Sequence, residues 1–308
     1  MPKITIVGAG NVGATAALFC AARSLGDVVI TDIVEGLPQG KALDIQQALP
    51  ISNTNAKVTG TNNYEDTANS DVVVITAGLP RKEGMTREDL IEINGKIISS
   101  ITKEIVKHSP NTIIIVVTNP VDSMTYIAAE VSNFPKSKVL GMAGCLDSAR
   151  LRAFLAQELN TPVDKVGAMT IGFHGEHMVP VASTAKVNGQ KVTELLSEEK
   201  LNEIIERTRN AGAEFLPLLK TSAWVAPGRS IAEMVEAIVK DEKKTISAPA
   251  WISGEYGYEN LYVGVPVILG KDGVEKILEI ELSDKEKQEF ANAVAHAKTL
   301  MEQVKGKY

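Results

Sequence analysis

Short runs of β-branched and aliphatic residues recur through the first half of the chain and alternate with segments of helical pattern. These runs are apolar at every position, which is typical of strands buried on both faces in a parallel sheet. The predicted strands are residues 4–7, 28–30, 72–75 and 113–117, and the clearest predicted helices are residues 12–23 and 89–108. This alternation predicts an α/β fold built on a Rossmann-type doubly wound parallel sheet.

The pattern changes after about residue 145. Long charged stretches at residues 195–209 and 283–303 predict helices, and the strands there carry more polar residues. Asn188 and Gly189 stand between β-prone residues and predict a hairpin, because Asn-Gly adopts the left-handed conformations of a two-residue turn. We therefore predict two domains, residues 1–144 and residues 145–308, of which the second is a mixed α+β domain.

The net charge of the chain bears on whether nucleic acids are among its partners. The chain has 308 residues, with 32 Lys plus Arg against 38 Asp plus Glu and a formal net charge of −6. Nucleic-acid affinity comes largely from cations that neutralise phosphates, so we expect no nucleic-acid partner. Glycines interrupt the apolar residues 4–22, and no run of about 18 apolar residues occurs elsewhere, so we expect neither a signal peptide nor a membrane span.

The cysteine content points to a reducing compartment. Cys20 and Cys145 are the two cysteines, and both have apolar or small neighbours in the sequence. Two cysteines in a chain of this length do not make a disulfide framework. We expect both to be reduced packing residues and the protein to be cytoplasmic.

A glycine motif of the form G-x-G-x-x-G follows the first predicted strand and opens the first predicted helix. It consists of Gly8, Ala9, Gly10, Asn11, Val12 and Gly13. In a dinucleotide site the first glycine makes the tight turn, the second lets the backbone approach the pyrophosphate, and the third lets helix and strand pack closely. Asp32 ends the second predicted strand, where a carboxylate accepts hydrogen bonds from the adenosine ribose and would repel a 2′-phosphate. The motif predicts NAD, in preference to NADP, in the first domain.

Two further segments leave predicted strands at the same edge of the sheet. One begins at Ala77, and the other is Thr118, Asn119 and Pro120, directly after Val117. The crevice of a doubly wound sheet lies where the strand order reverses, so both segments are expected beside the cofactor. The residues alone leave two readings of Asn119 open: a simple Asn-Pro turn, or an amide presented to the nicotinamide or substrate.

The four histidines divide into two pairs. His108 and His296 lie on charged helical segments and are expected to be solvated. His174 and His177 stand in a glycine-containing turn after an apolar strand, which favours an accessible ring. Their spacing permits zinc, but no third ligand stands at metal spacing, so we expect no metal.

Charged side chains near these elements have two readings each. Asp147 suits the N-cap of a helix, with Arg150 then on its surface; alternatively, Asp147 pairs with His174 and Arg150 meets a carboxylate. Arg81 and Arg87 lie in a loop rich in helix breakers and belong either to a solvated basic loop or to a substrate site. The residues alone do not decide between these readings.

Seven motifs together resemble the lactate/malate dehydrogenase family, and within it the malate dehydrogenases that are most similar to lactate dehydrogenase. The likeness extends from residue 4 to about residue 282. The motifs, in chain order, are GAGNVGA, EGLPQGKALD, AGLPRKEGMTR, VTNPVD, LDSARLR, GFHGEHMVP and GVPVILGKDGVEKI. The resemblance implies a reversible, NAD-dependent oxidation of (S)-malate to oxaloacetate in the tricarboxylic acid cycle, carried out by a homodimer or homotetramer.

The resemblance also implies roles for individual catalytic and substrate-binding residues of both domains. His174 accepts the proton when malate is oxidised, and Asp147 holds its ring and stabilises the imidazolium. Arg150 pairs in a bidentate manner with the C1 carboxylate, and Arg87 polarises the reacting carbonyl. Asn119 binds the substrate oxygen.

Other implied roles concern the lid and the cofactor. The loop from residue 80 to about residue 90 closes over the substrate, and Asn94 lies beside the cofactor. Arg81 stands where lactate enzymes carry a neutral Gln and would bind the second carboxylate, while Ala223 leaves room for the longer diacid. The implied cofactor-binding set is Gly8, Ala9, Gly10, Asn11, Val12, Gly13, Asp32, Asn94, Val117, Thr118 and Asn119.

The chain departs from the family pattern at four positions around the site. They are Glu83, Phe173, Glu176 and His177. None of these removes a catalytic group. They bear on the flexibility of the lid and on the pH profile.

Three alternatives accompany this prediction. A lactate dehydrogenase shares the family, and a catalytically silent NAD-binding protein shares the fold. A short-chain dehydrogenase is disfavoured, because none of the six tyrosines has a lysine four residues later.

Overall fold

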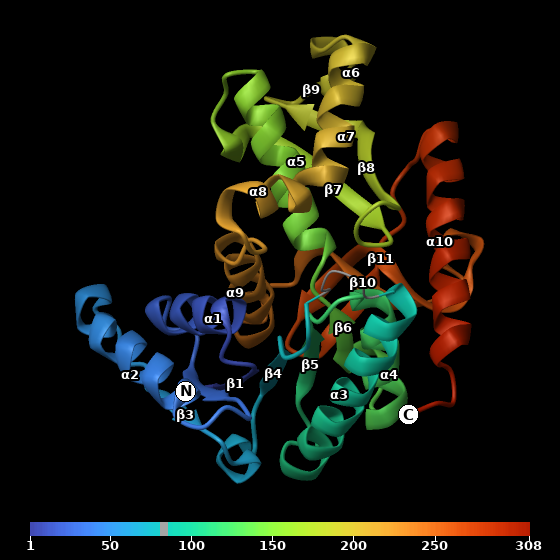
Figure 1. Cartoon of the computed structure of the whole chain (residues 1–308). Coiled ribbons are helices and arrows are strands. Elements are labelled where there is room, and N and C mark those ends of the chain that lie inside the picture. The colour runs from blue at the N-terminus through green and yellow to red at the C-terminus, as the bar shows by residue number, and fades with distance from the viewer. Residues whose placement is uncertain (81–85) are drawn as a thin grey trace.

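The β-branched runs of the first half form a parallel sheet, as predicted. The computed structural model describes residues 1–80 and 86–308. Within them, the first sheet has six strands in the order β3-β2-β1-β4-β5-β6 (Figure 1). The strands are β1 (Lys3–Val7), β2 (Asp27–Thr31), β3 (Val58–Thr61), β4 (Val72–Ile75), β5 (Ile113–Val116) and β6 (Val139–Gly141). The order reverses between β1 and β4, so the predicted switch point is confirmed.

Helices cover both faces of this sheet. They are α1 (Asn11–Ala22), α2 (Leu37–Ala48), α3 (Arg87–His108) and α4 (Val121–Ser132). From β1 the chain adds β2 and β3 toward one edge of the sheet, and from β4 it adds β5 and β6 toward the other edge. Right-handed crossovers therefore place α1 and α2 on one face and α3 and α4 on the other. The contacts agree, since α1 packs on α2 and α3 packs on α4. The doubly wound fold is confirmed.

Helix α3 begins two residues earlier than the sequence pattern predicted. The Oγ1 atom of Thr86 accepts a hydrogen bond from the backbone N–H of Asp89 at 3.0 Å. The Asp89 carboxylate in turn accepts one from the backbone N–H of Thr86 at 3.0 Å. This capping box satisfies two N–H groups at the start of the helix. The apolar periodicity begins only after it.

The second half is built on an antiparallel sheet with the strand order β10-β11-β7-β8-β9, and β12 pairs with β11. Its strands are β7 (Val166–Gly172), β8 (Met178–Val187), β9 (Gln190–Lys191), β10 (Lys244–Ser253), β11 (Glu259–Gly270) and β12 (Gly273–Ile277). Its helices are α5 (Gly144–Glu158), α6 (Val192–Leu195), α7 (Glu198–Glu214), α8 (Leu216–Leu219), α9 (Val225–Val239) and α10 (Asp284–Val304). Short 3₁₀ turns lie at Leu49–Ser52, Tyr64–Thr67, Lys136–Lys138, Val163–Lys165 and Glu255–Gly257.

The predicted hairpin at Asn188 and Gly189 is confirmed. Val187 pairs with Gln190, and the two residues between them have φ angles of 51° and 85°. Two successive positive φ angles are the signature of the two-residue turn that Asn-Gly favours.

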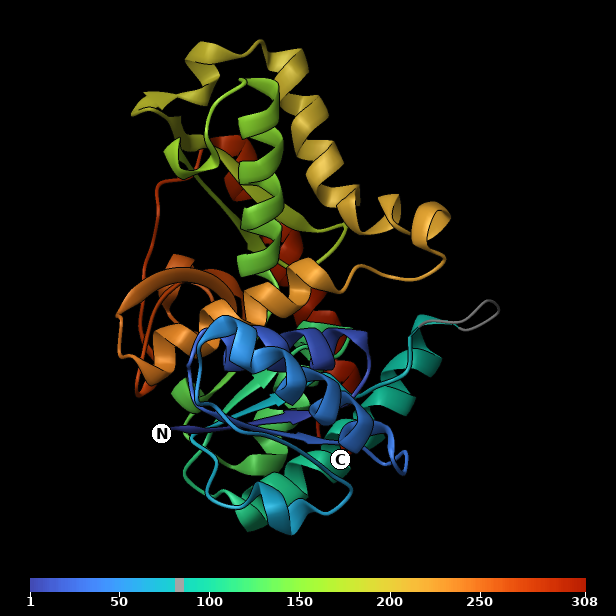
Figure 2. The same cartoon turned by 90° about the vertical axis from the view of Figure 1, so that its left-hand side faces the viewer.

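The two halves share a hydrophobic core. One cluster of buried side chains contains Ile4 and Ile115 of the first sheet together with Leu261 and Val265 of β11. Helix α9 packs along α1, and Figure 2 shows the two lying against each other. A second cluster of buried side chains contains Leu155 of α5, Ala185 of β8 and Ile204 of α7. The domain boundary at residue 144 remains a prediction.

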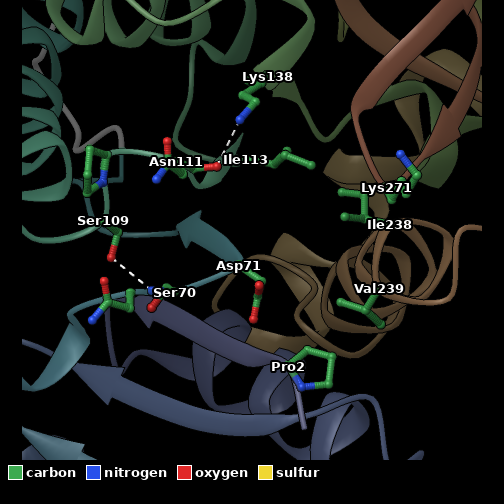
Figure 3. A pocket seen from close by; sticks show the side chains of 12 residues that line it. Pro2, Ser70, Asp71, Ser109, Asn111, Ile113, Lys138, Ile238, Val239 and Lys271 are labelled. Carbon is green, nitrogen blue, oxygen red and sulfur yellow. Dashed lines mark hydrogen bonds between the residues drawn. The ribbon is translucent and has the colours of Figure 1, made fainter.

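A cavity of about 320 Å³ lies at the amino ends of the strands, and Figure 3 shows the side chains that line it. Asp71 and Lys138 stand directly before β4 and β6, and both line it. The Lys138 ammonium donates to the Asn111 carbonyl at 3.0 Å, and the Ser109 hydroxyl oxygen accepts from the Ser70 N–H at 3.0 Å. These bonds tie the strand starts together. No residue of the predicted site is among its described lining.

Both cysteines are free, and Cys20 is fully buried. Burial raises the pKa of each thiol to about 12, so both are inert at neutral pH. Over the described ranges, we find no helix with the length and apolar character needed to cross a bilayer.

The expectation that His108 and His296 are solvated is wrong. The His108 side chain is 12% exposed, and its Nε2 atom lies 3.4 Å from a Glu104 oxygen on the same helix. His296 is half-buried and packs against aromatic rings beside the candidate site. Both residues lie on helix faces that pack inward, which the charges of their sequence neighbours do not reveal.

Candidate active site

The glycine motif forms a tight turn between β1 and α1. Gly8 has a φ of 109°, and a Cβ atom there would lie 2.7 Å from the Thr76 hydroxyl. A Cβ on Gly13 would lie 1.9 Å from the Gly8 carbonyl oxygen. A Cβ on Gly10, in contrast, would meet nothing within 4 Å. Gly8 and Gly13 are thus required by packing, while Gly10 leaves its backbone open to approach from outside.

The start of α1 fits an anionic group. Gly10 is its N-cap and supplies no side chain to bond the first N–H groups. No acidic residue occupies the first turn, which begins at Asn11 and Val12. Unsatisfied N–H groups and the positive end of the helix dipole favour a phosphate at this position. The described residues therefore fit the pyrophosphate of a dinucleotide.

Asp32 lies directly after β2 and contacts the glycine motif. One carboxylate oxygen accepts a hydrogen bond from the Ala9 N–H at 2.7 Å, and the other accepts from the Val34 N–H at 2.9 Å. These bonds hold the end of β2 against the turn that follows β1. The carboxylate is half-exposed beside that turn, at the position where sequence reasoning expected an adenosine ribose.

Asn94 fastens the loops that follow β4 and β5. Its side chain is fully buried on α3. The amide nitrogen donates to the Asn119 carbonyl at 2.7 Å and to the Leu79 carbonyl at 3.1 Å, and the amide oxygen accepts from the Leu79 N–H at 2.8 Å. The Thr118 hydroxyl adds a bond to the Ala77 carbonyl at 2.6 Å. Asn94 thus fixes the shape of both loops at the carboxyl edge of the sheet.

The structure brings Asp147 and His174 together. The His174 Nδ1 atom lies 2.7 Å from an Asp147 carboxylate oxygen, and the Arg150 Nη1 atom lies 3.3 Å from the other. The exposed fractions of these side chains are 2% for Asp147, 22% for His174 and 13% for Arg150. Helix α5 holds Asp147 and Arg150 one turn apart, and the loop after β7 carries His174.

The N-cap reading of Asp147 is wrong. Helix α5 begins at Gly144 and its N-cap is Ala143, so Asp147 lies inside the first turn. Its backbone N–H already bonds the Ala143 carbonyl at 3.0 Å. Its carboxylate is therefore free to contact His174 and Arg150.

Opposing effects act on the imidazole of His174. Burial lowers its pKa, but the charge and hydrogen bond of Asp147 and the charge of Asp122 raise it, against a lowering by Arg150. The net result is a pKa above the ordinary value for histidine. A histidine whose pKa is raised by a carboxylate that also holds its ring is suited to exchanging a proton with a substrate hydroxyl.

Asp122 is a part of this site that sequence reasoning missed. It lies in the first turn of α4 and is 3% exposed. One carboxyl oxygen lies 3.4 Å from the His174 backbone nitrogen. Burial raises the pKa of the Asp122 carboxyl to about 7. The signal in the sequence was a lone carboxylate in the apolar segment that follows Asn119 and Pro120.

An aromatic cluster borders the other side of the His174 loop. The rings of His177 and His296 lie 4.3 Å apart between centroids and are tilted by 37°. The Phe173 ring meets the His296 ring edge-on at 4.7 Å. Helix α10 therefore supports the loop through two residues at which this chain departs from the family pattern. No motif indicated that the C-terminal helix reaches the site.

Phe173, His174 and His177 line a cavity of about 290 Å³, together with residues that directly follow the parallel strand β5. Asn119 lies in its wall and is exposed, whereas Val117 is half-buried below it. Arg81 and Glu83 lie outside the described residues, and so does the side chain of Arg87, whose backbone begins α3. The cavity's described lining consists of Leu90, Asn119, Pro120, Val121, Phe173, His174, Gly175, Glu176 and His177.

The described residues contain no cluster of side chains suited to bind a metal ion. Across residues 1–80 and 86–308, no group of three or more His, Cys, Asp or Glu side chains is placed to hold an ion.

Comparisons with known proteins match the chain over nearly its full length. Residues 2–141 match the model of the lactate/malate dehydrogenase NAD binding domain, and residues 145–307 match that of the lactate/malate dehydrogenase alpha/beta C-terminal domain. A malate dehydrogenase from Rhodopirellula baltica is 53% identical over 99% of this chain and 98% of its own length.

Solved structures agree. A malate dehydrogenase from Salinibacter ruber is similar with a TM-score of 0.94 and 45% identity, over 98% of this chain and 97% of that one. A lactate dehydrogenase from Cryptosporidium parvum, solved with lactic acid and β-nicotinamide adenine dinucleotide, has a TM-score of 0.96 and 38% identity, over 99% of this chain and 98% of that one. With both family models matched and the fold shared, this chain belongs to the lactate/malate dehydrogenase family.

Proposed function

We propose that this chain is an NAD-dependent malate dehydrogenase that interconverts (S)-malate and oxaloacetate, with His174 as the proton acceptor. The observation that carries the proposal is the 2.7 Å contact between Asp147 and the Nδ1 atom of His174, a residue that lines the cavity. Relatives about 50% identical over nearly the full length of the chain bear the name malate dehydrogenase.

The proton path follows from the tautomer that Asp147 selects. Nδ1–H donates to the Asp147 carboxylate, which leaves Nε2 as the nitrogen that can take the hydroxyl proton of malate. The imidazolium that forms is stabilised by the buried carboxylate beside it. In the reverse direction the same nitrogen returns the proton to oxaloacetate.

Arg150 is suited to bind the C1 carboxylate of the substrate. Its contact with Asp147 fixes the guanidinium near His174 and leaves further N–H donors for a bidentate pair. Asn119 lies in the wall of the cavity, and we carry it over from the family motif as the residue whose amide binds the substrate oxygen. We carry Arg87 over from the family motif as the residue that polarises the carbonyl.

Bound NAD would supply the hydride acceptor. The glycine turn, the first N–H groups of α1 and the Asp32 carboxylate are the groups that would hold its adenosine and pyrophosphate. The remaining carried-over members of the cofactor site are Ala9, Asn11, Val12, Gly13, Asn94, Val117, Thr118 and Asn119.

The choice of substrate rests on Arg81 and Ala223. Oxaloacetate carries a second carboxylate where pyruvate has a methyl group, and Arg81 is the cation we propose for it. With pyruvate bound, a closed lid would bury this guanidinium without a partner, at a cost of about 3–5 kcal/mol. That cost corresponds to roughly two to four decades in kcat/KM, at about 1.4 kcal/mol per decade.

Side-by-side assays of NADH oxidation with oxaloacetate and pyruvate test this function. We expect oxaloacetate to be strongly preferred, and Arg81→Gln to lower its turnover while sparing or raising that of pyruvate. A wild-type preference for pyruvate would move the assignment to lactate, as would a preference that Arg81→Gln leaves unchanged. Failure with both 2-oxo acids would favour a catalytically silent NAD-binding protein.

We further propose a cytoplasmic homodimer or homotetramer. The support for self-association is the family resemblance, which implies a dimer or a tetramer. Light scattering over a range of concentrations distinguishes the two assemblies from a monomer.

A further inference from the structure

Asp122 contacts the main chain of His174, whereas Asp147 contacts its ring. The two aspartates come from different elements, α4 and α5. Asp147 contacts the imidazole ring, whereas the Asp122 Oδ2 atom lies 3.4 Å from the His174 backbone nitrogen and accepts its N–H. His174 is therefore held at both its side chain and its main chain by carboxyl groups.

The second carboxyl oxygen of Asp122 makes the charged form of this residue unfavourable in the folded protein. Oδ1 is buried and has no hydrogen-bond partner among the described residues. A buried carboxylate with an unsatisfied oxygen is unfavourable unless a nearby charge compensates for it. Asp122 also lies in the first turn of α4, where the helix dipole favours a negative charge. That dipole is the purely structural explanation, and it predicts no effect on His174.

We propose that Asp122 is a positioning residue that holds the main chain of His174 and, through its negative charge, favours the imidazolium form of that residue. The inference rests on the proposed function, because it gives Asp122 a part in the proton exchange of His174. Neither the family models nor the sequence motifs gave this residue a role.

The electrostatics agree with the geometry. After the effect of burial, the largest influence on the pKa of Asp122 is the charge of His174, which lowers it, whereas Asp147 raises it. Asp122 in turn raises the pKa of His174. Groups that favour each other's charged forms titrate as a coupled pair. Among the residues whose side chains the structure describes, the other charged or titratable groups around this pair are Asp147 and Arg150 on α5, Glu176 and His177 in the same loop, and His296 on α10.

The decisive variant is Asp122→Asn, which keeps the size of the side chain and an acceptor for the His174 N–H but removes the charge. The measurement is the pH dependence of kcat/KM in both directions at saturating cofactor. Malate oxidation needs neutral His174 and rises with pH, whereas oxaloacetate reduction needs the imidazolium and falls. We expect both midpoints to move to lower pH in the variant, because one of the charges that favours the imidazolium is gone.

Ser123→Ala is the matched control. Ser123 is the next residue on α4, is equally buried at 3% exposure, and its hydroxyl also has no hydrogen-bond partner among the described residues. Its substitution removes a buried polar atom without removing a charge, so both midpoints should stay in place. If the pH midpoints of Asp122→Asn stay in place or move to higher pH, the proposal is overturned, whether or not kcat/KM falls. The helix dipole would then be the remaining explanation of Asp122.

If the Asp122→Asn variant does not fold, a second measurement on the wild-type protein tests the proposal. In the wild type, carbon-13 NMR follows the Asp122 carboxyl and the His174 ring through a pH titration. We expect the Asp122 carboxyl signal to inflect near pH 7 and the His174 ring signal to respond to the same inflection. An Asp122 carboxyl that titrates alone near the ordinary aspartate value of about 3.9 would overturn the proposal. If the wild-type protein turns over oxaloacetate but Asp122 titrates alone, only the role of Asp122 is rejected. If the wild-type protein is inactive on every 2-oxo acid, the proposed function is rejected.

Discussion

Replacing Asp147 by Asn isolates the charge that acts on the His174 ring. The asparagine keeps an oxygen that can accept the Nδ1–H bond, so the ring geometry is preserved while the carboxylate charge is lost. Asp147 is 2% exposed and His174 is 22% exposed, so water screens this pair only weakly. Two unit charges about 4 Å apart at an effective dielectric constant of about 20 interact by about 4 kcal/mol.

The remaining neutral hydrogen bond offsets about 1 kcal/mol of that loss. A net loss of about 3 kcal/mol corresponds to about two decades in kcat/KM for oxaloacetate reduction. The sign of the pH effect follows from Asp147, which raises the pKa of His174. Without this charge the imidazolium is lost at lower pH, so the deficit of the variant grows as pH rises.

Steady-state NADH oxidation across pH measures this effect, and NADH fluorescence confirms that the cofactor still binds. Glu286→Gln serves as the control, since Glu286 is also a buried carboxylate, at 6% exposure, and it accepts the Ser183 N–H at 3.0 Å. That substitution should lower the stability of the fold and spare kcat/KM. If Asp147→Asn stays within about threefold of the wild type at every pH, the electrostatic account of His174 is wrong.

Two further predictions concern the cofactor and the stability of the fold. The wild type should have a higher kcat/KM with NADH than with NADPH, and Asp32→Asn should narrow that gap by removing the repulsive charge; equal values in the wild type would refute this role of Asp32. Asp122 has a pKa of about 7 in the folded protein against 3.8 for an ordinary aspartate, so its contribution to stability is present below that ordinary value and is lost as pH rises toward 7. Asp122→Asn should therefore gain stability relative to the wild type between about pH 4 and pH 8, by up to about 4 kcal/mol in urea unfolding, and a difference that does not vary with pH would contradict the burial of a titrating carboxyl.

Much of the fold could be predicted because strands that are buried on both faces appear in the sequence as short, continuous apolar runs. The run at residues 113–117 is apolar throughout, and its neighbours in the sheet have the same character. Helix starts were less predictable, because they depend on caps rather than on periodicity. Helix α3 begins with the Thr86–Asp89 capping box, and α5 begins at Gly144, ahead of the polar residues that suggested its start.

The site was predictable where a motif implied it, and less so where contacts join distant segments. The two readings of Asp147 could be separated only by its contact with His174, 27 residues away. Asp122 and His174 are 52 residues apart, and His296 reaches the same loop from the C-terminal helix. Such proximity arises from the packing of α4 and α10. The lone carboxylate of Asp122 in an apolar segment marks that residue as unusual, but the sequence around it does not show that it meets His174.

Turnover by His174→Asn is the measurement that tests the central claim most directly. The account predicts that the wild type oxidises NADH with oxaloacetate and that the variant loses about 10²–10⁴-fold in rate, the range that general acid–base groups contribute. NADH should bind to the variant with unchanged affinity, because His174 lies outside the glycine turn and α1. Near-normal turnover by His174→Asn would contradict the account and shift the proton-transfer role to His177 or remove it from this loop.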